Sequence, residues 1–398
     1  MMPTRFDTLP TATWPRLRAL LDGHAPGGGI INMTIGEPKH PFPGWVGPTL
    51  IEAIAEFNSY PDNNGTPELR KSIGGFLNRR YGVNVDIDSQ LMVLNGTREG
   101  LFNAVVALCQ TNSNILIPNP FYQVYTVAAM AIGAQPVYLP ASTKSGFLPD
   151  LDTLTSAELN KTSAFFLCSP SNPQGAVASV DYWRRLIALA ETYDFKIFAD
   201  ECYSEIYRRS PPPGALEVSA QMGADPERVV AFHSLSKRSN LPGLRSGFVA
   251  SGAKNIARIK QLRAYSGCPV AGPIQHVSAQ VWADEDHVVA NRQLYCGKFE
   301  AADHIFANIQ SYNSPEAGFF LWLPVEDDEV AALKLWTETG VRVLPGSYLG
   351  QVANEQNPGF GYIRVALVAP KEEMQRGLTN MRPACFCPSV GRRRPCGC

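Results

Sequence analysis

A lysine surrounded by hydroxyl and guanidinium groups is the strongest chemical feature of the sequence. Lys237 lies in FHSLSKRSNLPGLRSGF (residues 232–248), after an apolar run that ends at Ser234. Ser236 precedes the lysine, and Arg245 follows it by eight positions. Hydroxyls and a guanidinium together can bind a phosphate, and a lysine beside them could form a Schiff base with an aldehyde that carries this phosphate. Taken alone, such residues are more often a surface loop.

Two other segments supply partners for an aromatic nitrogen ring. FADECYSEIY contains Asp200 and Tyr203, and CSPSNPQGA contains Asn172. A carboxylate at the end of an apolar strand is costly to bury unless a cation or a hydrogen-bond donor meets it, and a protonated pyridine nitrogen is such a partner. Asn172 and Tyr203 could both hydrogen-bond one phenolic oxygen of the same ring. The simpler alternatives are a helix N-cap for Asp200 and a turn for Asn172-Pro173.

These residues lie near the ends of short apolar runs that alternate with helical patterns. The runs occupy residues 91–95, 114–118, 135–139, 163–169, 195–200 and 228–234, and helical patterns begin near residues 98, 122 and 180. Nearly continuous apolar strands are typical of sheets covered on both faces, so we expect an α/β layer around a mostly parallel sheet. The carboxyl ends of such strands face the ligand crevice, and they are occupied by Asn95, Ser169, Asp200 and Ser234.

A different pattern begins after about residue 283. A long helical stretch (286–309) precedes FFLWLPV, a helix around 330–338, VRVLP and GYIRVAL, which predicts a smaller α+β unit. The N-terminal segment has too little core of its own, so it should pack on this unit or on a neighbouring subunit. We expect a large cofactor-binding domain over 46–283 and a small domain made of 1–45 and 284–382.

Composition and charge exclude several classes of protein. The 398 residues suffice for two or three domains, and 45% hydrophobic with 18% charged residues excludes wholesale disorder. Lys and Arg total 35 against 36 Asp and Glu, a formal charge of −1, which argues against nucleic-acid binding. We find no apolar run of about 18 residues that predicts a membrane span. The first residues lack a secretory signal pattern, so we expect a cytoplasmic protein.

The polar residues described above match the motif of a known family. Asn172, Asp200, Tyr203, Lys237 and Arg245, with their spacing, resemble the signature of fold-type I, class I/II pyridoxal-phosphate aminotransferases. The resemblance covers roughly residues 32–369. It implies an aspartate-aminotransferase-like fold, with a large helix-covered parallel sheet and a smaller α+β domain. It also implies pyridoxal 5′-phosphate as the cofactor and amino transfer as the activity.

The resemblance assigns roles at the reacting end of the cofactor. Lys237 would hold the cofactor as a Schiff base and then act as base and acid in proton transfer. Asp200 would keep the pyridine nitrogen protonated, so that the ring accepts electrons. Asn172 and Tyr203 would bind the ring oxygen. Tyr122, in NPFYQVY, matches the aromatic residue that stacks on the ring, although a core tyrosine is the simpler alternative.

The resemblance also implies where the cofactor phosphate binds. Ser234, Ser236 and Arg245 would contact it through their side chains. NGTREGL opens a helix, so the backbone N–H groups of Thr97 and Arg98 would point at the same phosphate from a helix N-terminus.

Two further matches concern substrate and assembly. YPDNNGTPELR (60–70) resembles the family segment whose tyrosine, here Tyr60, reaches the phosphate in the neighbouring subunit, which implies a homodimer with shared active sites. GYIRVAL places Arg364 where the family clamps the substrate α-carboxylate in a bidentate fork. Gly36, in IGEPKH, would let the backbone approach the same carboxylate.

Three strings suggest a narrower group within the family. The resemblance is to the bacterial N-succinyldiaminopimelate aminotransferases of lysine biosynthesis, and it lies in IGEPKHPFP, LSKRSNLPGLRSGF and LPGSYLG. It implies that glutamate and 2-oxoglutarate are the other amino acid and oxo acid of the reaction. A carboxylate at the far end of the substrate would need a cationic partner, for which the candidates are Lys39, Arg98 and Arg238. The alternative for each is a solvated charge on the surface.

Other functions share parts of this motif. The same cofactor and fold would serve an aspartate, aromatic or alanine aminotransferase, or a carbon–sulfur lyase or synthase. A noncatalytic regulator that senses the cofactor would normally carry a DNA-binding helix-turn-helix, for which the segment before Asn32 leaves no room. A scaffold protein with a dead site would be expected to lack Lys237, Asp200 or Arg245, and all three are present.

The C-terminus departs from the family pattern. A final amphipathic helix is expected after about Met374, but NMRPACFCPSVGRRRPCGC follows, so we expect the helix to be lost and residues 383–398 to form a disordered or atypical tail. Cys385, Cys387, Cys396 and Cys398 form two C-x-C pairs whose spacing is not that of common zinc modules, so we expect no metal.

Overall fold

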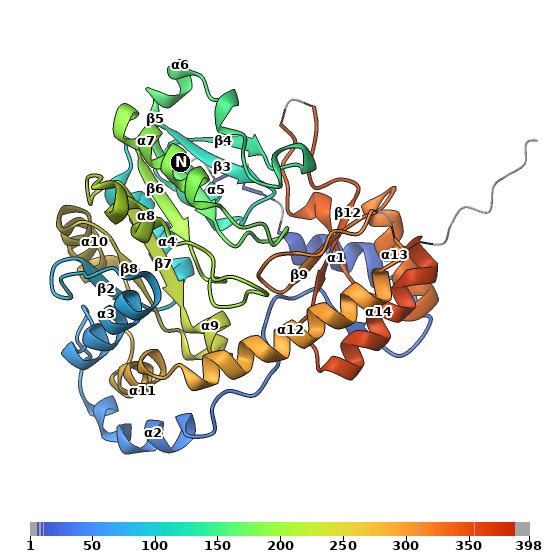
Figure 1. Ribbon diagram of the computed structural model, residues 1–398, viewed down its shortest axis with the longest axis horizontal. Helices are drawn as coiled ribbons and strands as arrows, with labels where there is room; N and C mark the ends of the chain where they lie inside the picture. Colours follow the sequence, from blue (N-terminus) through green and yellow to red (C-terminus); the bar gives the residue numbers. More distant parts are fainter. Residues whose placement is uncertain (1–5, 8, 11, 310, 354, 387–398) are drawn as a thin grey trace, which may run out of the picture.

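The computed structural model describes residues 6–386, apart from 8, 11, 310 and 354. The largest sheet consists of β2 (Leu91–Leu94), β3 (Asn114–Asn119), β4 (Gln135–Pro140), β5 (Thr162–Cys168), β6 (Lys196–Asp200), β7 (Val229–Ser234) and β8 (Gly247–Ala250). Its strand order is β2-β8-β7-β6-β5-β3-β4 (Figure 1). The ladders from β7 to β4 are parallel, and β8 is antiparallel to both of its neighbours. The predicted mostly parallel α/β sheet is confirmed.

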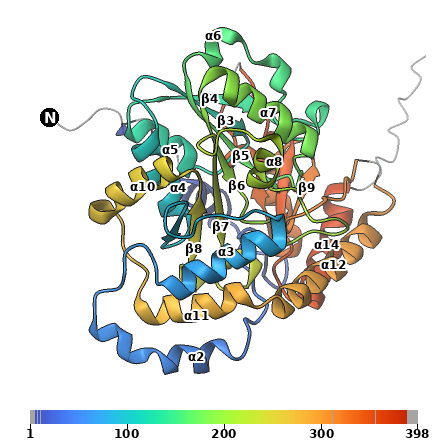
Figure 2. The ribbon, with the colours of Figure 1, turned by 60° about the vertical axis from the view of Figure 1, so that its left-hand side comes forward.

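Helices cover both faces of this sheet (Figure 2). One face packs against α4 (Thr97–Leu108), α5 (Val124–Ala131) and α10 (Ala253–Ser266). The other face packs against α3 (Pro67–Tyr81), α7 (Val180–Tyr193), α8 (Ala215–Met222) and α11 (Gly272–Ala283). Successive residues of one strand therefore enter opposite cores, as Phe165 and Phe166 do. This explains why the strands are apolar at nearly every position.

Strand β8 is the part of the sheet that the sequence pattern did not reveal. Its four residues, Gly247–Ala250, lie between β2 and β7, and all four are buried. The run has only four residues and directly follows the lysine and arginine motif, so it gives too short an apolar pattern to be recognised as a strand. The strand nevertheless matters, because it returns the chain from Arg245 past the lysine-bearing segment into the sheet.

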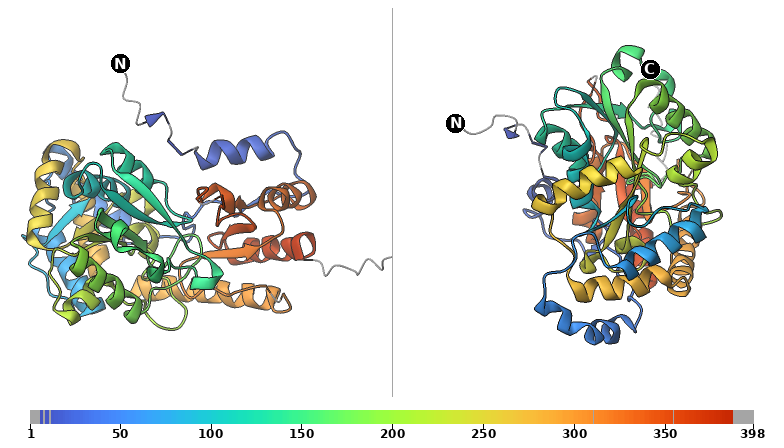
Figure 3. Two further views of the ribbon diagram at one scale, coloured as in Figure 1. Left: turned by 90° about the horizontal axis from the view of Figure 1, so that it is seen from above. Right: turned by 90° about the vertical axis from the view of Figure 1, so that its left-hand side faces the viewer.

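The C-terminal residues form a second unit beside the large sheet (Figure 3). Its antiparallel sheet has the order β11-β12-β9, with β9 (Phe320–Pro324), β11 (Leu344–Pro345) and β12 (Tyr362–Ala366). The sheet packs with α12 (Asp286–Phe306), α13 (Asp328–Thr339) and α14 (Lys371–Phe386). Helix α12 runs from the region of the large sheet to this unit, so it contacts both (Figure 1).

The N-terminal segment packs on this second unit. Strand β1 (Ile31–Asn32) pairs in parallel with β10 (Val341–Arg342), and α1 (Thr13–Leu21) buries Leu17 and Leu21 against a cluster that includes Trp336. The remaining short helices, α2 (Val46–Glu52), α6 (Ser156–Leu159) and α9 (Leu235–Arg238), lie in connections. The domain boundaries at residues 45 and 283 stay a prediction.

The expected loss of the last helix was wrong. Helix α14 continues to Phe386, and Met374, Leu378 and Met381 are buried in the core of the second unit. Their spacing of three and four residues forms one apolar helix face. The expectations for the tail fall on 387–398 and on the side chains of 383–386, which lie outside the described residues.

The helices do not suit a membrane-spanning role. The longest described helix, α12, has 21 residues, and its charged residues include Asp286, Arg292, Lys298 and Glu300. In the described part of the chain, no helix combines the length and the apolar character needed to cross a bilayer.

Candidate active site

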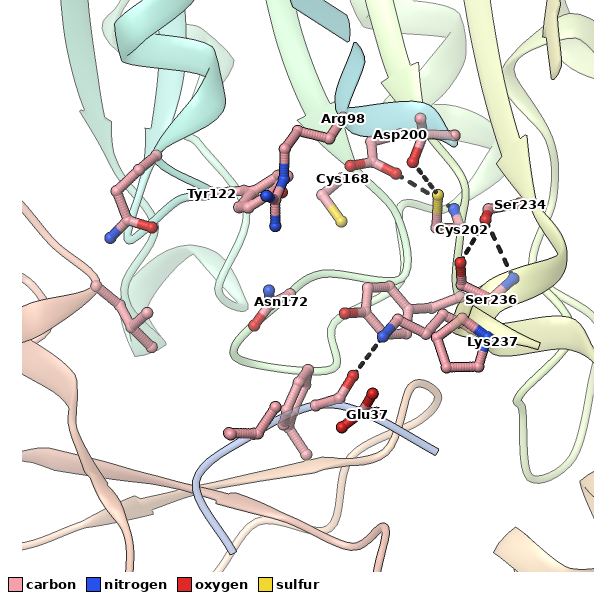
Figure 4. Close-up of a pocket in the computed structure, with 18 of the residues that line it drawn as sticks. Glu37, Arg98, Tyr122, Cys168, Asn172, Asp200, Cys202, Ser234, Ser236 and Lys237 are labelled. Atoms are coloured by element: carbon pink, nitrogen blue, oxygen red, sulfur yellow. Dashed lines mark hydrogen bonds between the residues drawn. The ribbon is translucent and has the colours of Figure 1, made fainter. Parts of the chain in front are cut away.

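A cavity of about 420 Å³ lies where the large sheet meets the second unit and the N-terminal segment. Asp200 and Ser234 reach it from the carboxyl ends of β6 and β7, and Lys237 reaches it from α9. Gly36 comes from the N-terminal segment and Arg364 from β12. The parallel strands end at one edge, so residues far apart in sequence converge there (Figure 4). Asn95 and Ser169, at the ends of β2 and β5, do not line the cavity.

Lys237 points into the cavity with little solvent around it. Its ammonium donates to the Gly36 carbonyl, and Nζ lies 5.3 Å and 5.9 Å from the ring centroids of Phe319 and Tyr203. Burial lowers the pKa of Lys237 to about 8, partly offset by Cys202, while Arg364 lowers it further. About a tenth of an amine with this pKa is neutral at pH 7, against less than about a thousandth at the usual value of 10.5, and the neutral form is the nucleophile and general base.

Asp200 is buried and already holds two donors. Tyr125 Oη donates to Oδ2 at 2.7 Å, and the backbone N–H of Cys202 donates to Oδ1 at 3.3 Å. Tyr125 is fully enclosed, and burial followed by the charge of Asp200 raises its pKa well above the usual value, so it remains a donor. Sequence reasoning missed Tyr125. Its signal was its position three residues after Tyr122 at the start of α5, but only the fold brings this helix to the end of β6.

An anion-binding cradle lies at the start of α4. Gly96 is its N-cap at φ 79°, and no side chain caps the helix, so the first N–H groups, including those of Thr97 and Arg98, are available to a ligand. The Arg245 guanidinium lies so close to Gly96 that a Cβ there would be 1.9 Å from its nitrogen, which explains the glycine. Ser234 and Ser236 add hydroxyls 2.9 Å apart.

Arg364 lies at the opposite side of the cavity and is only 5% exposed. One terminal nitrogen donates to Asn172 Oδ1 and the other to the Thr34 carbonyl, both at 2.8 Å, and the guanidinium stacks 4.3 Å from the Phe320 centroid. Nε has no hydrogen-bond partner among the described residues. Burial lowers its pKa to about 10, so the group is charged at pH 7 and can attract a carboxylate.

The tyrosines predicted to contact the cofactor do not all line the cavity. Tyr122 lines the cavity, and its hydroxyl accepts a hydrogen bond from Arg98 Nε at 2.6 Å, which leaves the outer nitrogens of Arg98 available to a ligand. Burial raises the pKa of Tyr122 and places that of Tyr203 well above the usual value, so both hydroxyls stay protonated. Tyr60 does not line this cavity and is fully exposed. Its predicted role requires a second copy of the chain.

Two of the three cations considered for a distal carboxylate do not face the cavity. Arg238 is buried beside it, and its guanidinium donates to the carbonyls of Val281 and Asp284 and to Glu285. The prediction that Arg238 binds a carboxylate of the substrate was therefore wrong, because its guanidinium is already hydrogen-bonded and ion-paired within the fold. Lys39 is exposed and outside the cavity lining, which leaves Arg98.

Other lining residues carried no recognisable motif. Glu37 follows Gly36 and has no hydrogen bond or ion pair in the described structure, and its charge raises the pKa of Lys237 (Figure 4). Cys168 and Cys202 flank Asp200, and burial raises the pKa of both thiols well above the usual value. Single acidic or thiol residues have no sequence signature, so only the fold shows that they belong to the site.

The residues present suit a phosphorylated pyridine aldehyde. The uncapped N-terminus of α4, two serines and Arg245 provide donors for a phosphate, and a buried carboxylate across the cavity suits a protonated ring nitrogen. Lys237, an amine of lowered pKa, lines the same cavity as Arg364, whose Nε has no hydrogen-bond partner among the described residues. These features combine aldehyde capture with carboxylate binding in one cavity.

Comparisons with known proteins agree with this chemistry. The model of the family "Aminotransferase class I and II" matches residues 29–380. A LL-diaminopimelate aminotransferase of Syntrophobacter fumaroxidans is 31% identical, over 93% of this chain and 95% of its own. The crystal structure of an aminotransferase from Neisseria meningitidis is 37% identical with a TM-score of 0.91, covering 96% of this chain and 99% of that one.

A third match shows the fold alone. A probable N-succinyldiaminopimelate aminotransferase from Thermus thermophilus superposes with a TM-score of 0.84 at 24% identity, over 94% of this chain and all of that one. The family model spans most of the sequence, and Lys237, Asp200 and Arg364 line one cavity. The chain therefore belongs to the class I and II aminotransferases, a family that uses pyridoxal phosphate.

Proposed function

We propose that the protein transfers the amino group of a diaminopimelate-type amino acid to 2-oxoglutarate. The observation that carries the transfer chemistry is the presence of the Lys237 amine and the Arg364 guanidinium in one cavity. The substrate class is supported by the names of relatives about 30% identical over nearly the whole chain, which are LL-diaminopimelate aminotransferases.

The succinylated form of the same amino acid is the second candidate. The strings IGEPKHPFP and LPGSYLG favour it, and the outer nitrogens of Arg98 could bind the additional carboxylate that a succinyl group brings. The free compound instead carries a second ammonium, for which Glu37 is the unpaired carboxylate of the cavity.

Each residue has a defined task in the proposed reaction. Pyridoxal phosphate, when bound, supplies the aldehyde and an electron-accepting ring. Arg364 binds the substrate α-carboxylate and so orients the α-carbon toward Lys237. The Lys237 amine takes the proton from that α-carbon and later returns a proton, acting first as base and then as acid. Asp200 stabilises a proton on the ring nitrogen, and Tyr125 holds the carboxylate in place.

We also infer that two copies of the chain complete the sites. Tyr60 is fully exposed, and Ile51, Ile54 and Phe57 on the preceding segment are exposed as well. An exposed apolar surface of this kind suits contact with a second copy. In such a dimer Tyr60 would reach the phosphate in the partner subunit.

A donor panel tests the substrate proposal. The full chain with pyridoxal phosphate would be assayed with 2-oxoglutarate and LL-diaminopimelate, its N-succinyl derivative, aspartate, alanine and phenylalanine. We expect kcat/KM for one diaminopimelate compound to exceed the others by about 10²-fold or more, since a site that hydrogen-bonds a distal group rejects substrates that lack it. A preference for aspartate, alanine or phenylalanine would contradict the substrate class and leave the transaminase chemistry intact.

The lowered pKa of Lys237 predicts the pH dependence of cofactor capture. Only the neutral amine attacks the aldehyde, so the rate constant for capture should rise with pH, pass its midpoint near pH 8 and then level off. An amine with the usual value of 10.5 would place the midpoint more than two units higher. Stopped-flow absorbance of the cofactor-free chain mixed with pyridoxal phosphate measures this midpoint, and a value above pH 10 would contradict the buried environment.

A further inference from the structure

Asn291 on α12 is a buried polar residue that the reaction described above does not use. It is 5% exposed, and its amide nitrogen donates to the carbonyls of Lys237 at 3.4 Å and Arg238 at 3.2 Å. Its oxygen lies 3.0 Å from Asn240 Nδ2 and 3.3 Å from His40 Nδ1. All the hydrogen bonds of the Asn291 side chain are thus made with His40 and with residues 237–240, which we call the lysine-bearing segment.

His40 ends the segment 33–40, which we call the strap. At its other end the strap is fixed to the second unit, because Met33 N–H donates to the Arg342 carbonyl and Ala366 N–H donates to the Met33 carbonyl. Between these ends the Thr34 carbonyl accepts from Arg364 and the Gly36 carbonyl accepts from Lys237. The strap therefore contacts both the substrate-binding arginine and the reacting amine.

Few hydrogen bonds hold the strap beyond Thr34. For residues 35–39 the structure describes one hydrogen bond, from Lys237 to Gly36, and Ile35, Glu37 and Lys39 are exposed. Apolar packing adds to this bond, because Pro38 is buried and Gly36 lies against Phe320. His40 is the first residue after this stretch with a polar contact, and its ring packs 4.9 Å from the Tyr295 centroid on α12. The contact between His40 and Asn291 is therefore the polar anchor of the strap at this end.

The hydrogen-bond pattern defines the state of His40 in this contact. Because the Asn291 nitrogen donates to two carbonyls, its oxygen faces the histidine, and Nδ1 of His40 must carry a proton and donate. Burial, together with the charge of Lys298, lowers the pKa of His40. A neutral ring with the proton on Nδ1 satisfies both conditions, and an amide nitrogen at the same place would also serve.

We propose that His40 and Asn291 are positioning residues that act as one latch, holding the strap against the lysine-bearing segment. The latch sets the Gly36 carbonyl, and with it the position of the Lys237 amine relative to Arg364, whose partner Thr34 lies next to the fixed end of the strap. Displacement of a reacting group by about 1 Å can cost about 10²-fold in rate, so a contact outside the cavity can control transfer. The inference rests on the transaminase chemistry of the family and not on the diaminopimelate proposal.

Steady-state kinetics with glutamate as donor tests the latch. We expect His40→Ala to lower kcat with glutamate about tenfold with a smaller change in KM, because the Gly36 carbonyl no longer positions the Lys237 amine while Thr34 still supports Arg364. Asn291→Ala should lower kcat by about tenfold or more, since it also frees the Lys237 carbonyl. In the double variant the two losses should not add, as expected for one unit. His40→Asn, which keeps a donor near Nδ1, should recover most of the lost kcat, and His40→Gln should not.

Limited proteolysis supplies a readout that does not depend on activity. Lys39 is exposed and is the only trypsin site in the strap, so cleavage after Lys39 in the cofactor-free chain reports release of the strap. We expect His40→Ala and Asn291→Ala to speed this cleavage about tenfold, and Lys39→Gln to abolish it. This measurement remains decisive even if glutamate is a poor donor.

Matched controls separate the latch from a loss of stability. Asn103 is a buried asparagine on α4 that binds Glu99 and Ser266 outside the cavity, and His276 is a half-buried histidine on α11 near Gln280. Asn103→Ala and His276→Ala should lower the melting temperature comparably without changing kcat or strap cleavage. Additive losses in the double variant, no rescue by His40→Asn, or unchanged cleavage after Lys39 would each overturn the latch.

Discussion

Lys237→Ala is expected to abolish amino transfer and the visible absorption of the bound cofactor together. The substitution removes the only lysine amine that lines the described cavity, and with it both the covalent link to the aldehyde and the base that moves the α-proton. General acid–base catalysis alone contributes about 10²–10⁴-fold, so a loss of at least about 10⁴-fold in kcat is expected when the covalent role is lost as well. Absorbance spectra and initial rates of the purified variant measure the two effects.

A control and a partial rescue sharpen this experiment. Lys254→Ala, at an exposed lysine on α10, should leave spectrum and rate unchanged. The anion-binding cradle at the start of α4 is unchanged in Lys237→Ala, so the variant should still bind the cofactor. It should lack the visible absorption band that the covalent link to Lys237 produces. Added small primary amines should restore part of the rate, since they can enter the space that the side chain leaves. Turnover at the level of the unaltered protein would contradict the assignment of Lys237.

Arg364→Lys is expected to lower kcat/KM by about 10²–10³-fold, mainly through KM. The lysine keeps one positive charge but cannot present two parallel N–H groups to a carboxylate while it also donates to Asn172 and Thr34. Breaking a buried hydrogen-bonded charge pair costs about 3–5 kcal/mol, which corresponds to this loss. Arg364 lies on the substrate side, so the visible absorption of the bound cofactor should change little.

Arg342→Lys is the matched control for Arg364→Lys. Arg342 also lies on a strand, pairs with Asp22 at 3.1 Å and stacks 4.7 Å from the Trp336 centroid, but it is outside the cavity. We expect this variant to keep the KM of the unaltered protein. If Arg364→Lys also kept that KM for every amino and oxo acid tried, the α-carboxylate would have to bind elsewhere in the cavity.

The residues for cofactor chemistry could be predicted because their types and spacing reflect local requirements. Asp200 and Ser234 end buried strands, Lys237 and Arg245 follow one of these strands, and Gly96 with Thr97 opens a helix. Parallel strands bring their carboxyl ends to one edge, so the strand pattern already implied that such residues meet. The mostly parallel sheet follows from the same reasoning, whereas amino transfer was implied by the resemblance to the family.

Other parts of the site depend on contacts between distant segments. Tyr125 reaches Asp200 only because α5 packs over the sheet, and the Gly36 carbonyl reaches Lys237 across 201 positions of sequence. Arg238 looks like a free cation in the sequence, but α11 and the following turn satisfy it. No local pattern records these contacts, because each is set by the packing of two elements against one another.

The sequence by itself therefore predicted the large sheet, since strand periodicity is a local property, and its resemblance to a known family implied the cofactor and the reaction class. Only the tertiary structure decided which cations face the substrate, that α14 is retained, and that His40 and Asn291 hold the strap beside Lys237. The physical reason is that a hydrogen bond or a buried charge is defined by where two side chains meet, and chain folding alone brings them together.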